Sequence, residues 1–306
     1  MNLIGRESEK TFLRNFLKSK HRLLQVYGQP SVGKTRLVTE VAVEARSIIN
    51  LCYPEAATEF FKAILDASKK LGTEKQKALL MVSYGHSLQS RNSLAVKEAQ
   101  WHFKSALRIL QNYGCDYQCL LIYNYMSLNY YRQGKLEKGI RAAEKALETT
   151  VFDRDRADVE HAKIYSYVHL THNLIFAGNH SKAGQVLHEQ LTLVGESGHP
   201  AVCYMLNNVG LNIERSGGLP NLALQFYLSS LFSKRSISCV QEHILVPTLC
   251  NVAGQFSKNK LRHDLALNFL HEAKEIRART GWVHPYTALV MWNIGMVTMR
   301  KNVKNT

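Results

Sequence analysis

A large apolar residue followed by a small one recurs at a nearly constant interval through most of this 306-residue chain. The pairs are Tyr84-Gly85, Met126-Ser127, Leu170-Thr171, Val209-Gly210, Val252-Ala253 and Ile294-Gly295, and successive pairs lie 42, 44, 39, 43 and 42 residues apart. A fixed period of this length is typical of stacked repeats, each of which buries its apolar face against its neighbours. The chain is therefore expected to fold as an array of repeats.

Each large–small pair lies in a segment with helical spacing. After each of the first five pairs come a turn and then a second amphipathic segment. The second segments place a small residue inward, at Ala99, Gly139, Ala183, Ala223 and Ala266. Small residues there let two helices approach closely, while large residues at i, i+3 and i+4 fill the seam. Gly134, Gly178 and Gly217 stand where the first helix must stop, a place that favours positive φ. The pattern predicts two-helix units over residues 74–113, 116–150, 158–195, 200–236 and 242–280, with a partial unit at 285–306.

The clearest unit, from Tyr123 to Leu147, resembles the tetratricopeptide repeat (TPR). The matching positions are Tyr123, Met126, Ser127, Tyr130, Gly134, Leu136, Gly139, Ala143, Ala146 and Leu147. The resemblance covers residues 51–306, and the period exceeds the usual 34 of the family, as in the longer-repeat subclass of kinesin light chains and nephrocystin-type proteins. It implies an all-α, right-handed TPR-like α-solenoid, an architecture for binding partners rather than for chemistry. A solenoid of another kind of helical hairpin is the alternative.

A phosphate-binding motif precedes the repeats. Residues 28–35 read GQPSVGKT and match the P-loop pattern, between a strand-like segment at 21–27 and a helix-like segment at 34–49. In a working site, Gly28 and Gly33 permit the tight loop, Lys34 reaches the β- and γ-phosphates, and Thr35 holds Mg²⁺. The LIGRE sequence at 3–7 resembles the entry to STAND or AAA-type P-loop NTPases. Residues 1–50 are thus interpreted as a truncated NTPase-like segment, a short strand–P-loop–helix remnant.

The rest of an NTPase module is missing from the sequence. A P-loop fold needs several parallel strands and an acid at the end of one of them to hold the metal. The nearest candidate, residues 63–66 (AILD), lies inside a helical pattern. We therefore expect no hydrolysis, no catalytic residues and no cofactor, with ATP and Mg²⁺ bound only if the P-loop is competent.

The last segment, residues 286–299, reads as a first helix whose second helix is absent. Solenoids usually end in a cap with a polar outer face, whereas this segment has apolar residues on more than one face. We interpret the chain as a truncated form or pseudogene-like product of a larger NTPase–TPR protein. The alternative is that this helix is itself the cap.

A candidate peptide groove follows from the residue before each large–small pair. These residues are Ser83, Tyr125, His169, Asn208, Asn251 and Asn293. Asparagine is a poor helix former, so its repetition on one helical face calls for a reason. In the long-repeat subclass, asparagines at this position bind the backbone of an extended peptide, and an amide suits that role because it both donates and accepts. The predicted groove residues are Asn208, Asn251, Asn293 and His169, and hydrogen bonding between repeats, or plain solvation, is the open alternative.

Charge and composition argue against several other classes of protein. The net charge is +15, but +5 of it lies in residues 1–50 and +6 in residues 258–306. No zinc-finger or recognition-helix signature accompanies this charge, so nucleic-acid binding is not expected. No apolar run reaches the ~18–20 residues of a membrane span. The six cysteines are scattered without a CxxC pair, which indicates reduced thiols and a cytoplasmic protein. His169 and His172 have no third ligand at a convincing spacing, so no metal site is predicted.

These features predict a non-enzymatic scaffold that binds a protein or peptide segment in the concave groove of its repeats. The alternative from a different class is an ATP- or GTP-binding STAND-type regulator with TPR sensor repeats. A nucleic-acid binder that uses its basic ends is a third hypothesis.

Overall fold

The computed structural model describes residues 54–71, 73–89, 93–195, 199–237, 242–258, 262–280 and 286–302. The predicted strand, P-loop and helix of residues 1–50 lie outside these residues, and so do Gly28, Gly33, Lys34 and Thr35.

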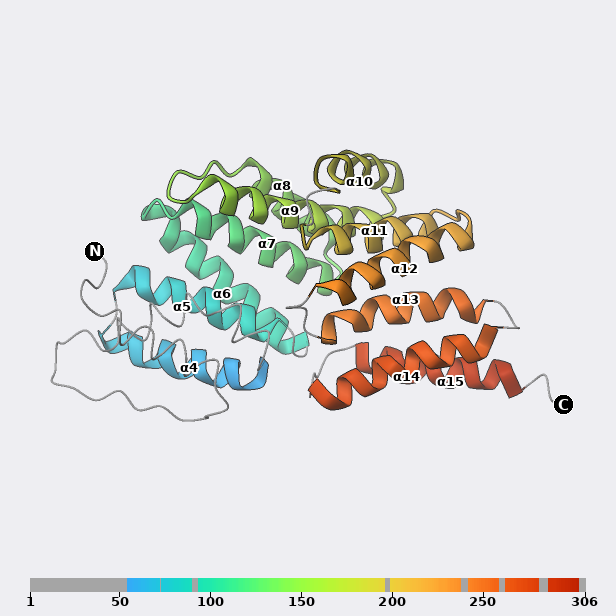
Figure 1. Ribbon diagram of the computed structural model, residues 1–306. Helices are drawn as coiled ribbons and strands as arrows, with labels where there is room; N and C mark the ends of the chain where they lie inside the picture. The colour runs from blue at the N-terminus through green and yellow to red at the C-terminus, as the bar shows by residue number, and fades with distance from the viewer. Residues whose placement is uncertain are drawn as a thin grey trace. The chain divides into compact units, whose positions relative to one another are not determined.

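All the regular secondary structure of the described residues is helical, and no strand occurs among them (Figure 1). The helices are α4 (Pro54–Leu71), α5 (Glu74–Leu88), α6 (Ser93–Asn112), α7 (Asp116–Arg132), α8 (Leu136–Glu148), α9 (Arg156–Phe176), α10 (His180–Val194), α11 (Val202–Arg215), α12 (Pro220–Ser236), the 3₁₀ helix η1 (Glu242–Leu245), α13 (Val246–Ser257), α14 (His263–Thr280) and α15 (Tyr286–Asn302). The all-α prediction is confirmed for this part of the chain.

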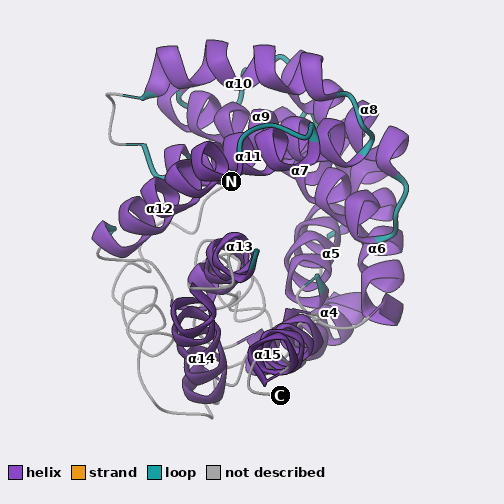
Figure 2. Ribbon diagram, turned by 90° about the vertical axis from the view of Figure 1, so that its right-hand side faces the viewer, coloured by secondary structure: helices purple, strands orange, loops and turns teal. Residues whose placement is uncertain are grey.

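The chain divides into two compact units. Unit 1 comprises the chain up to residue 125 together with the short segment 150–153. Unit 2 comprises residues 126–149 and 154–306. In unit 1, α5 packs against both α4 and α6. In unit 2, consecutive helices from α8 to α15 pack against one another, and α9 also contacts α11. Figure 2 shows α9 and α11 side by side, with α10 next to them.

At Gly85 and Gly210, the small residue of the repeat lies where two helices approach closely. A Cβ atom on Gly210 of α11 would lie 2.8 Å from the ring of Tyr227 and 3.0 Å from the carbonyl oxygen of Ala223, both on α12. In unit 1, a Cβ on Gly85 would lie 2.8 Å from the ring of Phe103. These distances are shorter than van der Waals contact, so a side chain there would push the second helix away.

The turns between helices follow the predicted glycine pattern. Gly134, Gly178 and Gly217 have φ of 69°, 81° and 78°, which confirms the expected positive values, and Gly114 is a fourth case with φ 58°. After Gly134, the Lys135 N–H donates to the Tyr130 carbonyl at 2.9 Å. This six-to-one bond is the Schellman end of a helix, and it needs a residue that tolerates the left-handed conformation.

One continuous apolar core runs through unit 2 from α8 to α15. Its largest fully buried side chains include Tyr227, Met205, Leu249 and Leu270. Since residues from each helix join this core, unit 2 is stabilised by contacts between neighbouring repeats, as expected for a repeat array.

Gly210→Ala is expected to lower the free energy of unfolding by about 1–3 kcal/mol, because the added methyl group collides with the ring of Tyr227. Gly295 occupies the corresponding position in α15, and a Cβ there would meet nothing within 4 Å. Gly295→Ala is therefore the matched control and should stabilise the helix by about 0.5–1 kcal/mol. Urea unfolding followed by circular dichroism measures both changes. Equal effects of the two substitutions would contradict this account of the repeat.

Candidate functional site

Asn208, the central residue of the predicted groove, lies between α9 and α11. Its side chain is only 2% exposed. Its Nδ2 donates to the Val168 carbonyl and to the Thr171 hydroxyl, both at 3.1 Å, and its Oδ1 lies 3.3 Å from Nδ1 of His172. The amide is thus engaged by the neighbouring repeat, which is the alternative that the sequence left open. A peptide could reach it only by displacing these bonds.

Other asparagines join the first helices in the same way. Asn173 of α9 is also fully buried and donates through Nδ2 to the Ser127 hydroxyl at 3.1 Å. Asn251 of α13 donates to Oδ1 of Asn207 on α11, also at 3.1 Å. We call these contacts the asparagine ladder, formed by Asn173, Asn208 and Asn251 with their partners on the preceding first helix. The ladder explains why asparagine recurs in helices despite its low propensity.

Two neutral histidines lie beside the ladder on α9. Burial lowers the pKa of His172 to about 4, and burial together with the nearby His172 does the same for His169. Because Asn208 uses its Nδ2 as a donor, its Oδ1 accepts from His172, and this assigns the proton of the neutral ring to Nδ1. Nε2 of His172 then remains as a hydrogen-bond acceptor.

Aromatic side chains surround His172. The ring of Tyr131 meets it edge to face at a centroid distance of 4.3 Å, and the ring of Phe176 lies 5.0 Å away. The guanidinium of Arg215 from α11 lies 3.9 Å above the Phe176 ring, and Arg215 is exposed. We call Tyr131, His169, His172, Phe176 and Arg215 the aromatic–histidine cluster. It presents a cation, apolar ring edges and a neutral acceptor within one patch of unit 2.

Of the predicted groove residues, His169 lies on α9 next to Val168, whose carbonyl accepts from Asn208 of α11. His169 is half-buried, and Asn208 is buried. Asn251 is half-buried and reaches α11 through Asn207. Asn293 is half-buried on α15, and no hydrogen bond of its amide is present among the described residues. These four residues therefore do not form one continuous row of open amides.

A buried lysine lies at the α12–α13 contact. Lys234 is 2% exposed, and its Nζ donates to the Thr248 hydroxyl at 2.6 Å and lies 4.8 Å above the ring of Tyr204. Thr248 in turn donates to Oδ1 of Asn207 at 3.2 Å, so the lysine is connected to the asparagine ladder. Burial lowers the pKa of Lys234 to about 8. A charged group in this position is costly and tolerated because it is hydrogen-bonded.

Lys234 and Arg215 were not among the residues predicted from the sequence. A signal for Lys234 was present, because it lies seven residues after the buried Tyr227, on the inward face of α12. No comparable signal existed for Arg215, whose position over Phe176 depends on the packing of two helices that are 39 residues apart in sequence.

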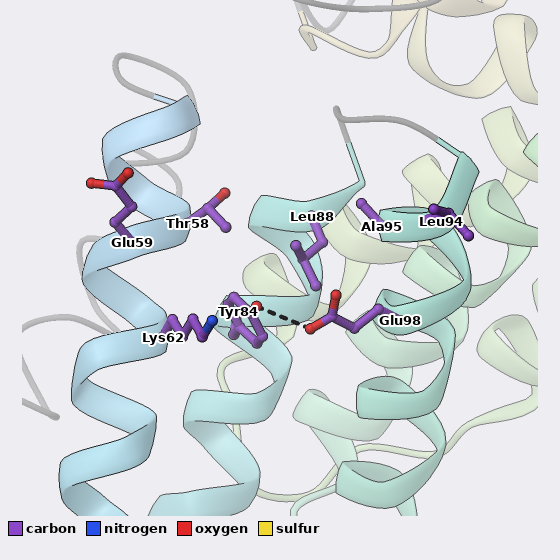
Figure 3. A pocket seen from close by; sticks show the side chains of 8 residues that line it. All are labelled: Thr58, Glu59, Lys62, Tyr84, Leu88, Leu94, Ala95 and Glu98. Atoms are coloured by element: carbon purple, nitrogen blue, oxygen red, sulfur yellow. Dashed lines mark hydrogen bonds between the residues drawn. The ribbon is translucent and has the colours of Figure 1, made fainter.

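Unit 1 contains an open pocket of about 380 Å³ between α4, α5 and α6 (Figure 3). Its lining residues are Thr58, Glu59, Lys62, Tyr84, Leu88, Leu94, Ala95 and Glu98. The Tyr84 hydroxyl donates to the Glu98 carboxylate at 3.0 Å. The pocket therefore combines apolar walls with one cation and two carboxylates.

Within the described ranges, no group of three or more histidine, cysteine or acidic residues is placed to hold a metal ion. None of the described helices has the length and apolar character required to cross a membrane.

Comparison with known proteins supports the fold. No protein-family model matches the chain, and no curated protein matches its sequence. Among solved structures, the crystal structure of the APC/C hetero-tetramer Cut9-Hcn1 is similar, with a TM-score of 0.57 and 15% sequence identity. The match covers 98% of this chain and 55% of that chain, so the chain spans about half the length of its structural neighbour. At this identity the likeness establishes the fold alone, a TPR-like array of helical repeats.

Asn208→Ala is expected to lower the free energy of unfolding by about 1–3 kcal/mol, because it leaves buried partners on α9 without their hydrogen bonds. Asn251→Ala removes one bond at a half-buried site and should cost about 0.5–1.5 kcal/mol. Urea titration of both variants checks the order. A negligible effect of Asn208→Ala would show that the ladder does not hold the repeats together.

Lys234→Met is expected to change how stability depends on pH. The pKa of Lys234 is lowered from 10.5 to about 8 in the folded chain, so the unfolded chain binds more protons between these values. The difference in unfolding free energy, wild type minus variant, should therefore increase as the pH rises above about 8. The total increase should be on the order of 3 kcal/mol. Urea unfolding at pH 7, 8, 9 and 10 measures the difference, with Lys274→Met at an exposed position of α14 as control. A difference independent of pH would contradict the burial of a charged lysine.

Proposed function

We propose that this chain is a non-enzymatic protein-interaction scaffold that binds a segment of another protein at the aromatic–histidine cluster. The TPR-like fold supports a role in holding partners, because such arrays present extended surfaces built from successive helices. The similar structure is a hetero-tetramer of Cut9 and Hcn1, so a protein of related fold assembles with another chain. Membership of the long-repeat, kinesin-light-chain-like type and right-handed winding are part of the same proposal.

The observation that carries this proposal is the exposed guanidinium of Arg215 over the ring of Phe176. Arginine and aromatic side chains are the residue types most often found at the energetic centres of protein interfaces. The neutral rings of His169 and His172 add hydrogen-bonding groups without adding charge. Asn293, on α15, is proposed as a separate peptide contact, whereas Asn208 contributes by holding α9 against α11.

A displayed library of random peptides tests this function directly. Peptides selected on the wild-type protein are expected to bind at least about tenfold more weakly to a His169→Ala/Arg215→Ala variant. Arg141→Ala, at an exposed position on α8, is the matched control and should leave binding unchanged. Fluorescence anisotropy of labelled peptides gives the dissociation constants. Failure to select any peptide, or equal binding by all three proteins, would refute the proposal.

The P-loop sequence supports a second candidate function, that of a nucleotide-binding regulator with TPR sensor repeats. Its residues Gly28, Gly33, Lys34 and Thr35 have the chemistry to hold ATP and Mg²⁺. The origin from a truncated NTPase–TPR protein remains part of our proposal, in which the motif has lost its surroundings and no longer supports hydrolysis.

Titration calorimetry with Mg-ATP separates the two candidates. The scaffold proposal expects no binding by the wild type or by Lys34→Ala. Binding that is lost in the Lys34→Ala variant would instead favour the nucleotide-binding regulator, because this lysine contacts the phosphates in a competent P-loop.

A further inference from the structure

The exposed face of α6 carries two large apolar side chains among cations. Leu94 is 73% exposed and Trp101 is 59% exposed. Lys97, Lys104 and Arg108 are also exposed on this helix. An exposed tryptophan near an exposed leucine is unusual on a surface that only meets water, and such patches commonly mark interaction sites. We call these five residues the α6 face.

The spacing of the α6 face fits contact with another helix. Leu94, Trp101 and Arg108 follow one another at intervals of seven residues, and Lys97 and Lys104 form a second row with the same interval. Two rows offset by three or four residues form the seam along which two helices pack side by side. The opposite side of the helix faces inward, as shown by the buried Ala95, Val96 and Ala99.

The charge of the α6 face is predominantly positive. No ion pair of Lys97, Lys104 or Arg108 occurs among the described residues. Helix α6 also has an exposed acid, Glu98, but it holds three basic residues against this one, whereas α8 holds three basic and three acidic residues. The α6 face thus has an excess of positive charge along a seam with apolar anchors, which is complementary to an acidic amphipathic surface.

The adjoining pocket favours a protein over a nucleic acid or a lipid surface. Leu94 belongs both to the α6 face and to the lining of the 380 Å³ pocket, which also contains Leu88 and Ala95. Figure 3 shows Glu98 on α6 and Glu59 on α4, both lining this pocket. These carboxylates would repel phosphate groups, whereas the apolar walls can accept an aliphatic side chain.

We propose that the α6 face binds an acidic amphipathic helix of a partner protein. The partner's apolar row packs against Leu94 and Trp101 and places one side chain in the pocket, and its glutamates or aspartates face Lys97, Lys104 and Arg108. This site lies in unit 1 on a second helix, so it is independent of the peptide site proposed above for unit 2.

The probe is a synthetic 21-residue helix with leucine and glutamate each repeated at heptad spacing. The control probe is the same helix with lysine in place of glutamate. Binding is followed by the fluorescence of Trp101 in the full chain with Trp282→Phe and Trp292→Phe, since these are the other two tryptophans. The acidic helix is expected to shift the emission of Trp101 to the blue in a saturable manner, as the indole leaves water. The lysine helix should not bind, and added salt should weaken the acidic complex.

Lys97→Glu/Lys104→Glu should weaken binding of the acidic helix by about tenfold or more, because both changes reverse charge within the seam. Lys138→Glu/Lys145→Glu on α8 is the matched control, with two exposed lysines at the same interval of seven. Circular dichroism confirms that both variants fold. The proposal is overturned if neither helix binds, or if the α8 variant weakens binding as much as the α6 variant. It is also overturned if phosphatidylserine vesicles or oligouridylate, rather than the acidic helix, shift the emission of Trp101.

Discussion

The close approach of paired helices is the constraint on which the structure depends. At Gly210 the ring of Tyr227 occupies the space where a side chain would begin, and at Gly139 the amide of Asn173 does the same. A bulkier residue at either position would separate two helices and so remove contacts along their whole length. The small residues at these two positions meet this requirement.

Polar contacts between helices fix the register in which the apolar surfaces pack. Apolar surfaces alone attract without strong direction, so they allow neighbouring helices to slide or rotate. The asparagine ladder and the Lys234–Thr248–Asn207 chain can form only when particular helices lie in one register. A buried lysine lowers stability in itself, and its hydrogen bonds offset part of that cost. We interpret these contacts as devices that specify which surfaces of the repeats meet.

The helices and their turns could be predicted from the sequence because the determinants are local. The spacing of large and small residues and the glycines at 134, 178 and 217 act within a few residues of one another, and the structure confirms their positive φ. The role of Asn208 could not be decided in this way, since an amide can serve a bound peptide or a neighbouring helix equally well. Its partners lie 36 to 40 residues away in sequence, and only the packing of α9 on α11 identifies them. Arg215 was missed for the same reason.

The use of the ladder amides within the chain changes where partner binding should be sought. A peptide that competes for Asn208 would have to break contacts that hold the repeats together, so recognition at low cost must use side chains that are not already engaged in this way. Arg215 meets this condition on a first helix. Trp101 and its flanking lysines meet it on a second helix, where the exposed indole gains from leaving water and the lysines form no ion pair among the described residues. Amides whose hydrogen bonds are already made within the chain join the repeats, whereas exposed groups such as Arg215 and Trp101 remain available to a partner. Binding is therefore assigned to surfaces that the repeat pattern in the sequence does not identify by itself.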